Sequence, residues 1–149
     1  MEGNPMKFSI AALGLAAALA FAVALPEAAL AQPADFLTVK KVACAPERMT
    51  RCKEGGVECE SKEASAGDKK QLLVIDFAVK KAVMRREGEE RPYGDVGEEK
   101  VEGDTRIIVL VRQQGERKNL VTFRLDKSGK MESTQNEGRV KLEVTCAAE

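Results

Sequence analysis

Four cysteines constrain the fold of this 149-residue chain more than any other feature of its sequence. A structural zinc site made of cysteines normally contains paired Cys-x-x-Cys knuckles, which this chain lacks, and the chain has no histidine. The lack of Cys-x-x-Cys-His also excludes covalent haem attachment. We therefore predict two disulfides, no metal and no cofactor. Three pairings are possible for four such residues, which are Cys44, Cys52, Cys59 and Cys146.

The start of the chain indicates export. An almost unbroken apolar run from Ile10 to Leu25 follows a basic residue and precedes Ala29-Leu30-Ala31, as in a secretory signal peptide. A membrane anchor is less favoured, because the run is shorter than the roughly 20 residues that span a bilayer. We predict a cleaved signal peptide over 1–31 and no membrane span in the mature domain, 32–149. The mature protein is then periplasmic or secreted, in a compartment where disulfides persist.

The segment from Cys52 to Cys59 indicates how the cysteines pair. Gly55-Gly56 at its centre is typical of a two-residue type I′ turn, in which both central residues adopt positive φ. Counting outward from this turn, Cys52 lies opposite Cys59, and opposed strand residues are close enough for a disulfide. Cys44 is left to pair with Cys146, which joins the first and last strands of the mature domain.

Alternating and β-branched apolar segments predict an antiparallel sheet. The clearest buried strand is 105–112, and turns at Asp126–Gly129 and Asn136–Gly138 follow it. These signals predict a four-strand meander from 105 to 146. The other predicted strands are 36–44 with a bulge at Lys40-Lys41, 72–77, and one that follows a turn at 78–81 and runs through Val83. A helix over 78–86 is the alternative for the last of these.

Composition limits the size and type of the core. Removal of the 31-residue leader leaves 118 residues with four aromatic side chains, so we expect one core made mostly of valine, leucine and isoleucine. We predict a single all-β domain. It is a small antiparallel meander, rolled sheet or partial barrel of about seven or eight strands, closed by two disulfides.

Residues 87–104 are the longest segment without a strand pattern, with four glycines and eight acidic side chains. We predict a solvated loop here, because long irregular segments of compact domains are usually either functional or disordered. The acidic residues do not have the spacing of a calcium-binding loop. Arg91, Tyr93 and Asp95 are therefore the candidate contacts for a partner.

Charge and side-chain chemistry argue against two classes of function. The leader holds one lysine and two glutamates of the 24 basic and 24 acidic residues, so the mature chain has a net charge of about +1. Its basic pairs have no interleaved aromatic residues for stacking on bases, so we predict no nucleic-acid partner. Histidine, a nucleophile elbow and a phosphate loop are all lacking, so we predict no enzyme activity. A hydrolase with a pair of carboxylates is the least favoured alternative.

Several short motifs resemble those of small uncharacterised exported bacterial β-proteins. The shared features are an early cysteine, a hydrophobic-Asp-x-x-x-Lys turn at Asp76–Lys80, the hairpin Leu125-Asp126-Lys127-Ser128-Gly129-Lys130, and a final strand ending in Cys146. A more distant likeness is to periplasmic inhibitors of C-type lysozyme, which are disulfide-closed barrels with a Ser-Gly-x-x-Tyr loop. Ser128-Gly129 matches the start of that loop, and Glu132 stands in place of its tyrosine.

These resemblances imply an exported β-domain and bring no catalytic residues with them. We expect a non-enzymatic binding or envelope-associated module whose partner is an unknown protein or envelope component. The alternative is an inhibitor of a cell-wall hydrolase or protease.

Overall fold

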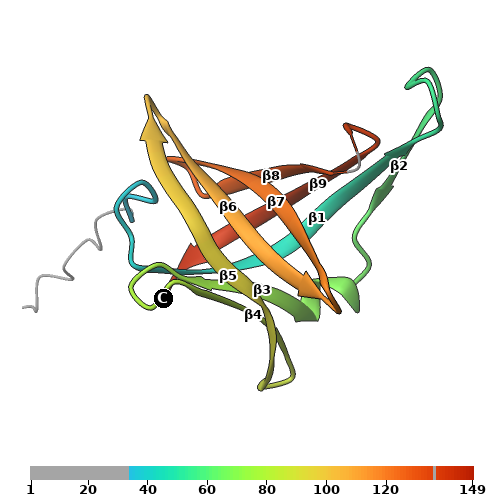
Figure 1. Ribbon diagram of the computed structural model, residues 1–149. Helices are drawn as coiled ribbons and strands as arrows, with labels where there is room; N and C mark the ends of the chain where they lie inside the picture. Colours follow the sequence, from blue (N-terminus) through green and yellow to red (C-terminus); the bar gives the residue numbers. More distant parts are fainter. Residues whose placement is uncertain (1–33, 136) are drawn as a thin grey trace, which may run out of the picture. The chain divides into compact units, whose positions relative to one another are not determined.

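Strands account for most of the protein in the computed structural model, which describes residues 34–135 and 137–149 (Figure 1). The leader predicted over 1–31 lies outside the described residues. Within them there are nine strands and one short 3-10 helix. The strands are β1 (Lys41–Cys52), β2 (Cys59–Glu63), β3 (Gln71–Asp76), β4 (Lys81–Arg86), β5 (Glu89–Glu102), β6 (Thr105–Gln114), β7 (Arg117–Asp126), β8 (Lys130–Gln135) and β9 (Val140–Ala148), and the helix is η1 (Asp68–Lys70).

Eight of the described strands form a closed antiparallel barrel. Each strand from β3 to β8 pairs with its successor, while β1 pairs with β3 on one edge and with β9 on the other, so the sheet closes on itself. The ninth strand, β2, pairs with the second half of β1, beyond the part that pairs with β3. The prediction of an all-β antiparallel domain is confirmed, and the barrel is complete rather than partial.

The meander predicted from 105 to 146 is confirmed as β6 to β9. Its predicted turn between β7 and β8 forms because Asp126 Oδ1 accepts hydrogen bonds from the backbone N–H groups of Ser128 and Lys130. Asn136, the first residue of the other predicted turn, lies outside the described residues.

The hairpin of β3 and β4 is also confirmed, and the helical alternative over 78–86 is wrong. Asp76 Oδ1 accepts two backbone hydrogen bonds from the turn at 77–80, which reverses the chain before a helix can begin. β4 runs from Lys81 through Val83 to Arg86.

The strand predicted over 36–44 is wrong in its first half. β1 begins at Lys41, and residues 36–38 form a turn in which the carbonyl of Asp35 accepts two backbone hydrogen bonds. The turn buries Phe36 against the barrel core. The apolar residues that indicated a strand therefore close one end of the barrel instead.

The loop predicted over 87–104 is wrong, because most of it is β5, the longest of the described strands at 14 residues. Glu87 and Gly88 both have positive φ and make a two-residue turn between β4 and β5. β5 has two bulges, at Tyr93 in its pairing with β4 and at Gly97 in its pairing with β6. These bulges interrupt the alternation of apolar side chains, which hides the strand in the sequence.

Both predicted disulfides are confirmed. Cys44–Cys146 joins directly opposed residues of β1 and β9, so it crosses the seam at which the barrel closes, and both residues are buried. Cys52–Cys59 joins opposed residues at the adjoining ends of β1 and β2. The first disulfide therefore lies inside the barrel and the second stabilises a hairpin outside it.

Two local features of β1 and β2 differ from the prediction. The N–H of Gly56 donates to the carbonyl of Lys53 at 3.0 Å, which centres the turn one residue before Gly55-Gly56. The bulge in β1 lies farther along the strand than predicted, between Pro46 and Arg48. Neither difference changes the register of the cysteines.

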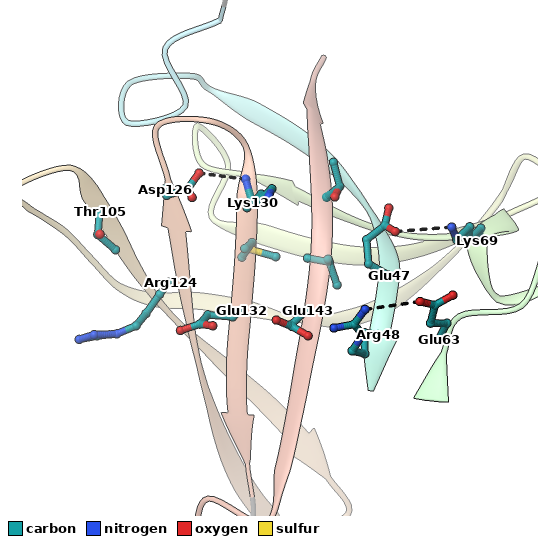
Figure 2. A pocket seen from close by; sticks show the side chains of 13 residues that line it. Glu47, Arg48, Glu63, Lys69, Thr105, Arg124, Asp126, Lys130, Glu132 and Glu143 are labelled. Atoms are coloured by element: carbon teal, nitrogen blue, oxygen red, sulfur yellow. Dashed lines mark hydrogen bonds and ion pairs between the residues drawn. The ribbon is translucent and has the colours of Figure 1, made fainter. Parts of the chain in front are cut away.

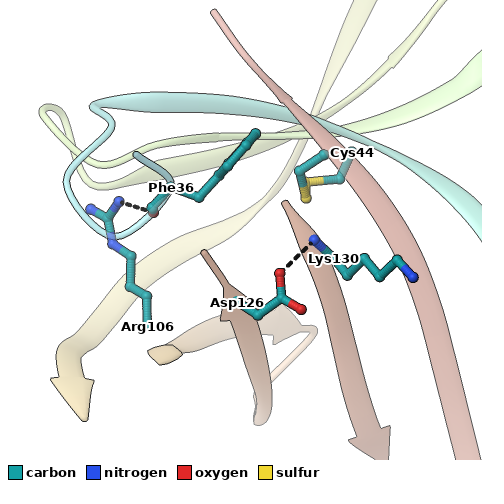
Figure 3. The surroundings of a disulfide bond; sticks show 6 residues. Phe36, Cys44, Arg106, Asp126 and Lys130 are labelled. Atoms are coloured by element: carbon teal, nitrogen blue, oxygen red, sulfur yellow. Dashed lines mark hydrogen bonds between the residues drawn. A yellow bond between two sulfur atoms is a disulfide. The ribbon is translucent and has the colours of Figure 1, made fainter. Parts of the chain in front are cut away.

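A buried arginine closes one end of the barrel (Figure 3). Arg106 on β6 is 4% exposed, and its Nη1 donates to the carbonyl oxygens of Phe36 at 3.3 Å and Val39 at 2.7 Å. Its guanidinium carbon lies 3.5 Å from the centre of the Phe77 ring, and Nε and Nη2 donate to Glu99 Oε1. One cation thus connects the N-terminal turn, the β3–β4 turn and β5 to β6.

Glu99 balances the charge of this arginine. Its second carboxylate oxygen, Oε2, accepts a hydrogen bond from Lys80 Nζ at 2.7 Å. Burial alone would raise the pKa of Glu99, but the bonds from Lys80 and Arg106 outweigh it and hold the pKa below its ordinary value. The carboxylate therefore stabilises the fold at neutral pH, and this contribution is lost as the pH falls through the folded-state pKa.

Gly129 allows the β7–β8 turn to pack against the closed end. Its φ is +88°, and a Cβ added here would lie 2.8 Å from Phe36 Cζ and 2.9 Å from the carbonyl oxygen of Cys146. A side chain does not fit at this position without moving the Phe36 ring or the end of β9.

We expect the two disulfides to contribute unequally to stability. Cys44–Cys146 spans 102 residues of sequence and Cys52–Cys59 spans 7. The chain-entropy relation gives a loss of about 4–5 kcal/mol in the free energy of unfolding for C44A/C146A and about 2–3 kcal/mol for C52A/C59A. Urea denaturation of the oxidised proteins measures both losses. Equal losses would contradict the assignment of the first disulfide to the barrel seam.

We expect Arg106→Met to destabilise the barrel by about 3–5 kcal/mol, because Glu99 and two carbonyl groups lose a buried partner. Arg124→Met is the matched control. Arg124 lies on β7 opposite Ile107 and is exposed, so its replacement should change the free energy of unfolding by less than about 0.5 kcal/mol. Urea denaturation of both variants tests this, and similar losses would show that Arg106 has no special structural role.

Candidate binding site at the open end of the barrel

The end of the barrel opposite the N-terminal turn is open. Successive turns of an up-and-down barrel lie at alternate ends, which places the β4–β5, β6–β7 and β8–β9 turns together at this end. Figure 1 shows the N-terminal turn and the tip of the β1–β2 hairpin at opposite ends of the barrel. A cavity of about 540 Å³ lies at the open end, within the size range of small-molecule sites.

Apolar side chains form the floor of this cavity, and charged and polar side chains line much of the rest. Leu73, Phe123 and Val144 are buried at its floor, and the partly buried Met84 and Leu142 line it as well. All five belong to the core cluster or pack against it. The cavity is therefore the unfilled top of the barrel interior, and an apolar group that enters it continues the core.

Tyr93 reaches the cavity because of the first bulge in β5. β5 pairs with β4 on either side of Tyr93, which is left as the extra residue, and bulges commonly redirect a side chain in this way. The ring packs against the core and lies 4.3 Å from the guanidinium carbon of Arg112 on β6. The next residue is Gly94, where an added Cβ would lie 2.7 Å from the carbonyl oxygen of Val111. Glycine is thus needed for β5 to approach β6 beside the bulge.

The environment of Tyr93 changes its acidity. Burial raises the pKa of the Tyr93 hydroxyl above its ordinary value, although the charge and the hydrogen bond of Arg112 act in the opposite direction. The phenol therefore keeps its proton at neutral pH.

The β1–β2 hairpin, residues 48–63, forms one side of the opening of this cavity. We call this hairpin the tongue and the opening the mouth. Met49 on β1 lies opposite Lys62 on β2, and Arg51 lies opposite Glu60. Directly opposed residues share a face of the sheet, and all four line the cavity. The inner face of the tongue therefore carries an apolar side chain near the barrel and charged side chains around it.

The three predicted contact residues do not form one loop. Tyr93 lines the cavity, and Arg91 lies opposite Met84, so it shares the inward face of the sheet near the mouth. Asp95 lies opposite Lys81 on the outer face and forms an ion pair with it at 2.6 Å. The structure brings Arg91 and Tyr93 to one end of the barrel and separates Asp95 from them. A role for these residues in partner contact stays a prediction.

Sequence reasoning missed the charged residues of the tongue. The signal that locates them is the register of the Cys52–Cys59 pair. Extended outward, this register places Arg51 opposite Glu60 and then Met49 opposite Lys62. The apolar floor could not be assigned to a cavity, because its residues have the same alternation as residues that fill a core.

A second hollow, of about 760 Å³, lies on the outer face of β7, β8, β9 and β1 and is lined mostly by charged residues (Figure 2). A row of directly opposed side chains crosses these strands and ends on β2. In order the row is Arg124, Glu132, Glu143, Arg48 and Glu63. Two carboxylates are therefore neighbours at its centre.

Glu132 and Glu143 are neighbouring carboxylates, as in a hydrolase, but their surroundings differ from those of a catalytic pair. Lys141 Nζ lies 2.9 Å from a Glu132 oxygen and 3.6 Å from a Glu143 oxygen, and the two carboxylates are 47% and 39% exposed. The hydrogen bond to Glu132 raises the pKa of Lys141, so the ammonium stays charged between them. A glycosidase pair requires one protonated carboxyl and room for the substrate between the two. The row therefore favours cross-strand ion pairing over hydrolysis.

The residues that resemble the lysozyme-inhibitor loop lie away from the mouth. Ser128 Oγ hydrogen-bonds to Asp126, and Gly129 packs against Phe36 at the closed end, while Glu132 belongs to the outer hollow. Across residues 34–135 and 137–149, no group of three or more histidine, cysteine, aspartate or glutamate side chains is placed to hold a metal ion.

We expect Tyr93 to give stability a dependence on alkaline pH. Its folded-state pKa is raised, so its contribution is complete below the unfolded-state value of about 10 and is lost as the pH rises through the folded-state pKa. Tyr93→Phe should remove this part of the decline, measured by urea denaturation at several pH values. Since Tyr93 is the chain's one tyrosine, phenolate absorbance titrates it directly. Identical titration in folded and urea-unfolded protein would contradict its burial.

In the part of the chain that the structure describes, no helix is long and apolar enough to cross a membrane. Comparisons with protein-family models, with curated proteins and with solved structures found no match. The candidate site therefore rests on the geometry and chemistry of the barrel itself.

Proposed function

We propose that this protein is an exported, non-enzymatic binding module that takes an apolar group into the open end of its barrel. The observation that carries this proposal is the cavity of about 540 Å³ above a packed core. An eight-stranded barrel has room for one small ligand when its interior is not filled by side chains. The two disulfides are consistent with an oxidising compartment outside the cytoplasm.

The fixed walls of the cavity support binding. The N-terminal turn and Arg106 hold one end of the barrel, and Cys44–Cys146 holds the seam between β1 and β9. A site whose walls are already ordered loses less conformational entropy when it is occupied. This favours recognition by a preformed site over folding around a partner.

The chemistry of the lining supports binding rather than catalysis. Tyr93 carries the one hydroxyl among the side chains that line the cavity, and its raised pKa keeps the oxygen protonated and weakly nucleophilic at neutral pH. The sulfur of Cys44 is bonded to Cys146 and cannot act as a thiolate. The remaining groups can orient a ligand through charge and hydrogen bonds.

A neutral fluorescent probe tests the site directly. We expect N-phenyl-1-naphthylamine to bind the mature protein with one saturable site, because its rings fit an apolar cavity and brighten there. Met84→Trp places extra volume in the cavity and should weaken binding by about tenfold or more, as overfilled hydrophobic pockets do. Fluorescence titration measures both affinities.

Val79→Trp is the matched control for this experiment. Val79 is an exposed residue of the β3–β4 turn at the closed end, so the same bulky side chain there should leave probe affinity unchanged. Urea denaturation confirms that both variants fold. Absence of saturable binding to the wild type, or equal affinity in Met84→Trp, would overturn the proposed site.

A further inference from the structure

We infer that the ligand of the barrel mouth is a single-chain amphiphile with an anionic head group, of the fatty-acid class. Its apolar tail enters the cavity, and its carboxylate lies at the inner face of the tongue between Arg51 and Lys62. This inference rests on the proposed function and adds the chemistry of the ligand.

The two tongue cations are available to an anion. Lys62 and Arg51 both line the cavity, and neither forms an ion pair with another described residue. Within the described residues, the Arg51 side chain makes one hydrogen bond, which Nε donates to Met49 Sδ at 3.4 Å. Lys62 attracts the negative charge of Asp68, and Arg51 lies opposite Glu60, but no described carboxylate is within ion-pair distance of either cation. Both cations can therefore approach an anionic head group at the edge of the cavity.

Most of the nearby carboxylates are already engaged. Glu63 pairs with Arg48 at 3.4 Å. Asp68 accepts hydrogen bonds from the hydroxyl and the backbone N–H of Ser65, which hold the pKa of Asp68 below its ordinary value. Asp68 stays negatively charged and Glu60 lies opposite Arg51, so both of these lining carboxylates oppose an incoming anion.

Further positive charge lies around the mouth on the opposite wall. Arg91 shares the inward face of the sheet with Met84, and Arg112 stacks on Tyr93. Arg112 Nε is buried and has no hydrogen-bond partner among the described residues. The cavity lining holds three basic and three acidic side chains, so the positive charge added near the mouth comes from Arg91 and Arg112, which are not part of the lining.

The apolar lining favours a ligand with an extended alkyl tail over one with a compact apolar group. Met49, Pro46 and Cys44 line the cavity in order along β1, from the tongue toward the core. Five residues of strand extend for about 16 Å, so the lining along β1 reaches from the tongue cations down to the floor of the cavity. An extended alkyl tail fits such a path with its head left at the rim.

Head-group selectivity tests the inference. We expect decanoate to bind about tenfold more tightly than decanol, and decyltrimethylammonium to bind more weakly than decanol, because hydrogen bonds to a charged group contribute only for the anion. Acetate, which has the head without the tail, should not bind measurably. Calorimetry below micelle-forming concentrations gives the affinities. Emission from Tyr93, the one tyrosine in a chain without tryptophan, reports occupation of the mouth.

Charge variants identify the head-group site. R51Q/K62Q should reduce decanoate affinity about tenfold and leave decanol affinity unchanged, because only the head-group contacts are removed. Glu60→Gln should strengthen decanoate binding. Arg124→Gln removes one positive charge from the outer face and should change neither affinity.

The outcomes separate this inference from the proposed function. Equal binding of decanoate and decanol, unaffected by R51Q/K62Q, would overturn the anionic head group while the cavity still binds apolar molecules. Tighter binding of decyltrimethylammonium would also overturn it. If neither the decyl compounds nor the neutral naphthylamine probe binds, both the inference and the proposed function fail.

Discussion

The buried guanidinium of Arg106 is the interaction on which the rest of this barrel depends. A closed sheet has two open ends, and backbone carbonyl groups buried at an end need partners. Arg106 supplies donors to the carbonyls of Phe36 and Val39 and covers the face of Phe77. Its own charge is tolerated in the interior because Glu99 lies against it. Sealing this end with polar contacts leaves the apolar interior accessible from the other one.

β1 gives the open end its asymmetry. One edge of this strand pairs with β9 along most of its length, whereas the other pairs first with β3 and then with β2. The bulge between Pro46 and Arg48 lies where the partner changes. The first half of the strand is therefore barrel wall, held by Cys44–Cys146, and the second half projects past the wall as the tongue. The cavity is therefore bounded on one side by the charged tongue, which extends beyond the other strands of the barrel.

Much of the architecture was predictable, because strong local signals agreed with the fold. The Cys52–Cys59 spacing and the aspartate turn at Asp126–Gly129 fix hairpins through short-range geometry. The 87–104 segment failed because its turn uses Glu87-Gly88 in place of a common asparagine or aspartate pair, and because two bulges shift its alternation. The cavity could not be predicted from the sequence, because it depends on how completely side chains from opposite sides of the barrel fill the interior. Tyr93 was selected for its exposure in a loop, yet it lines the cavity from a strand.

The floor of the cavity has a consequence for how this protein can diversify. Phe123 and Val144 belong both to the core that stabilises the barrel and to the lining of the proposed binding cavity. A change there alters stability and recognition together, and core losses of several kcal/mol are comparable to the whole stability of a small domain. The charged residues of the tongue are not part of the core, because they lie on a hairpin that has its own disulfide. They are Arg51, Glu60 and Lys62. The charges of the proposed head-group site can therefore change with little effect on the fold, whereas the depth of the cavity is as hard to alter as the fold itself.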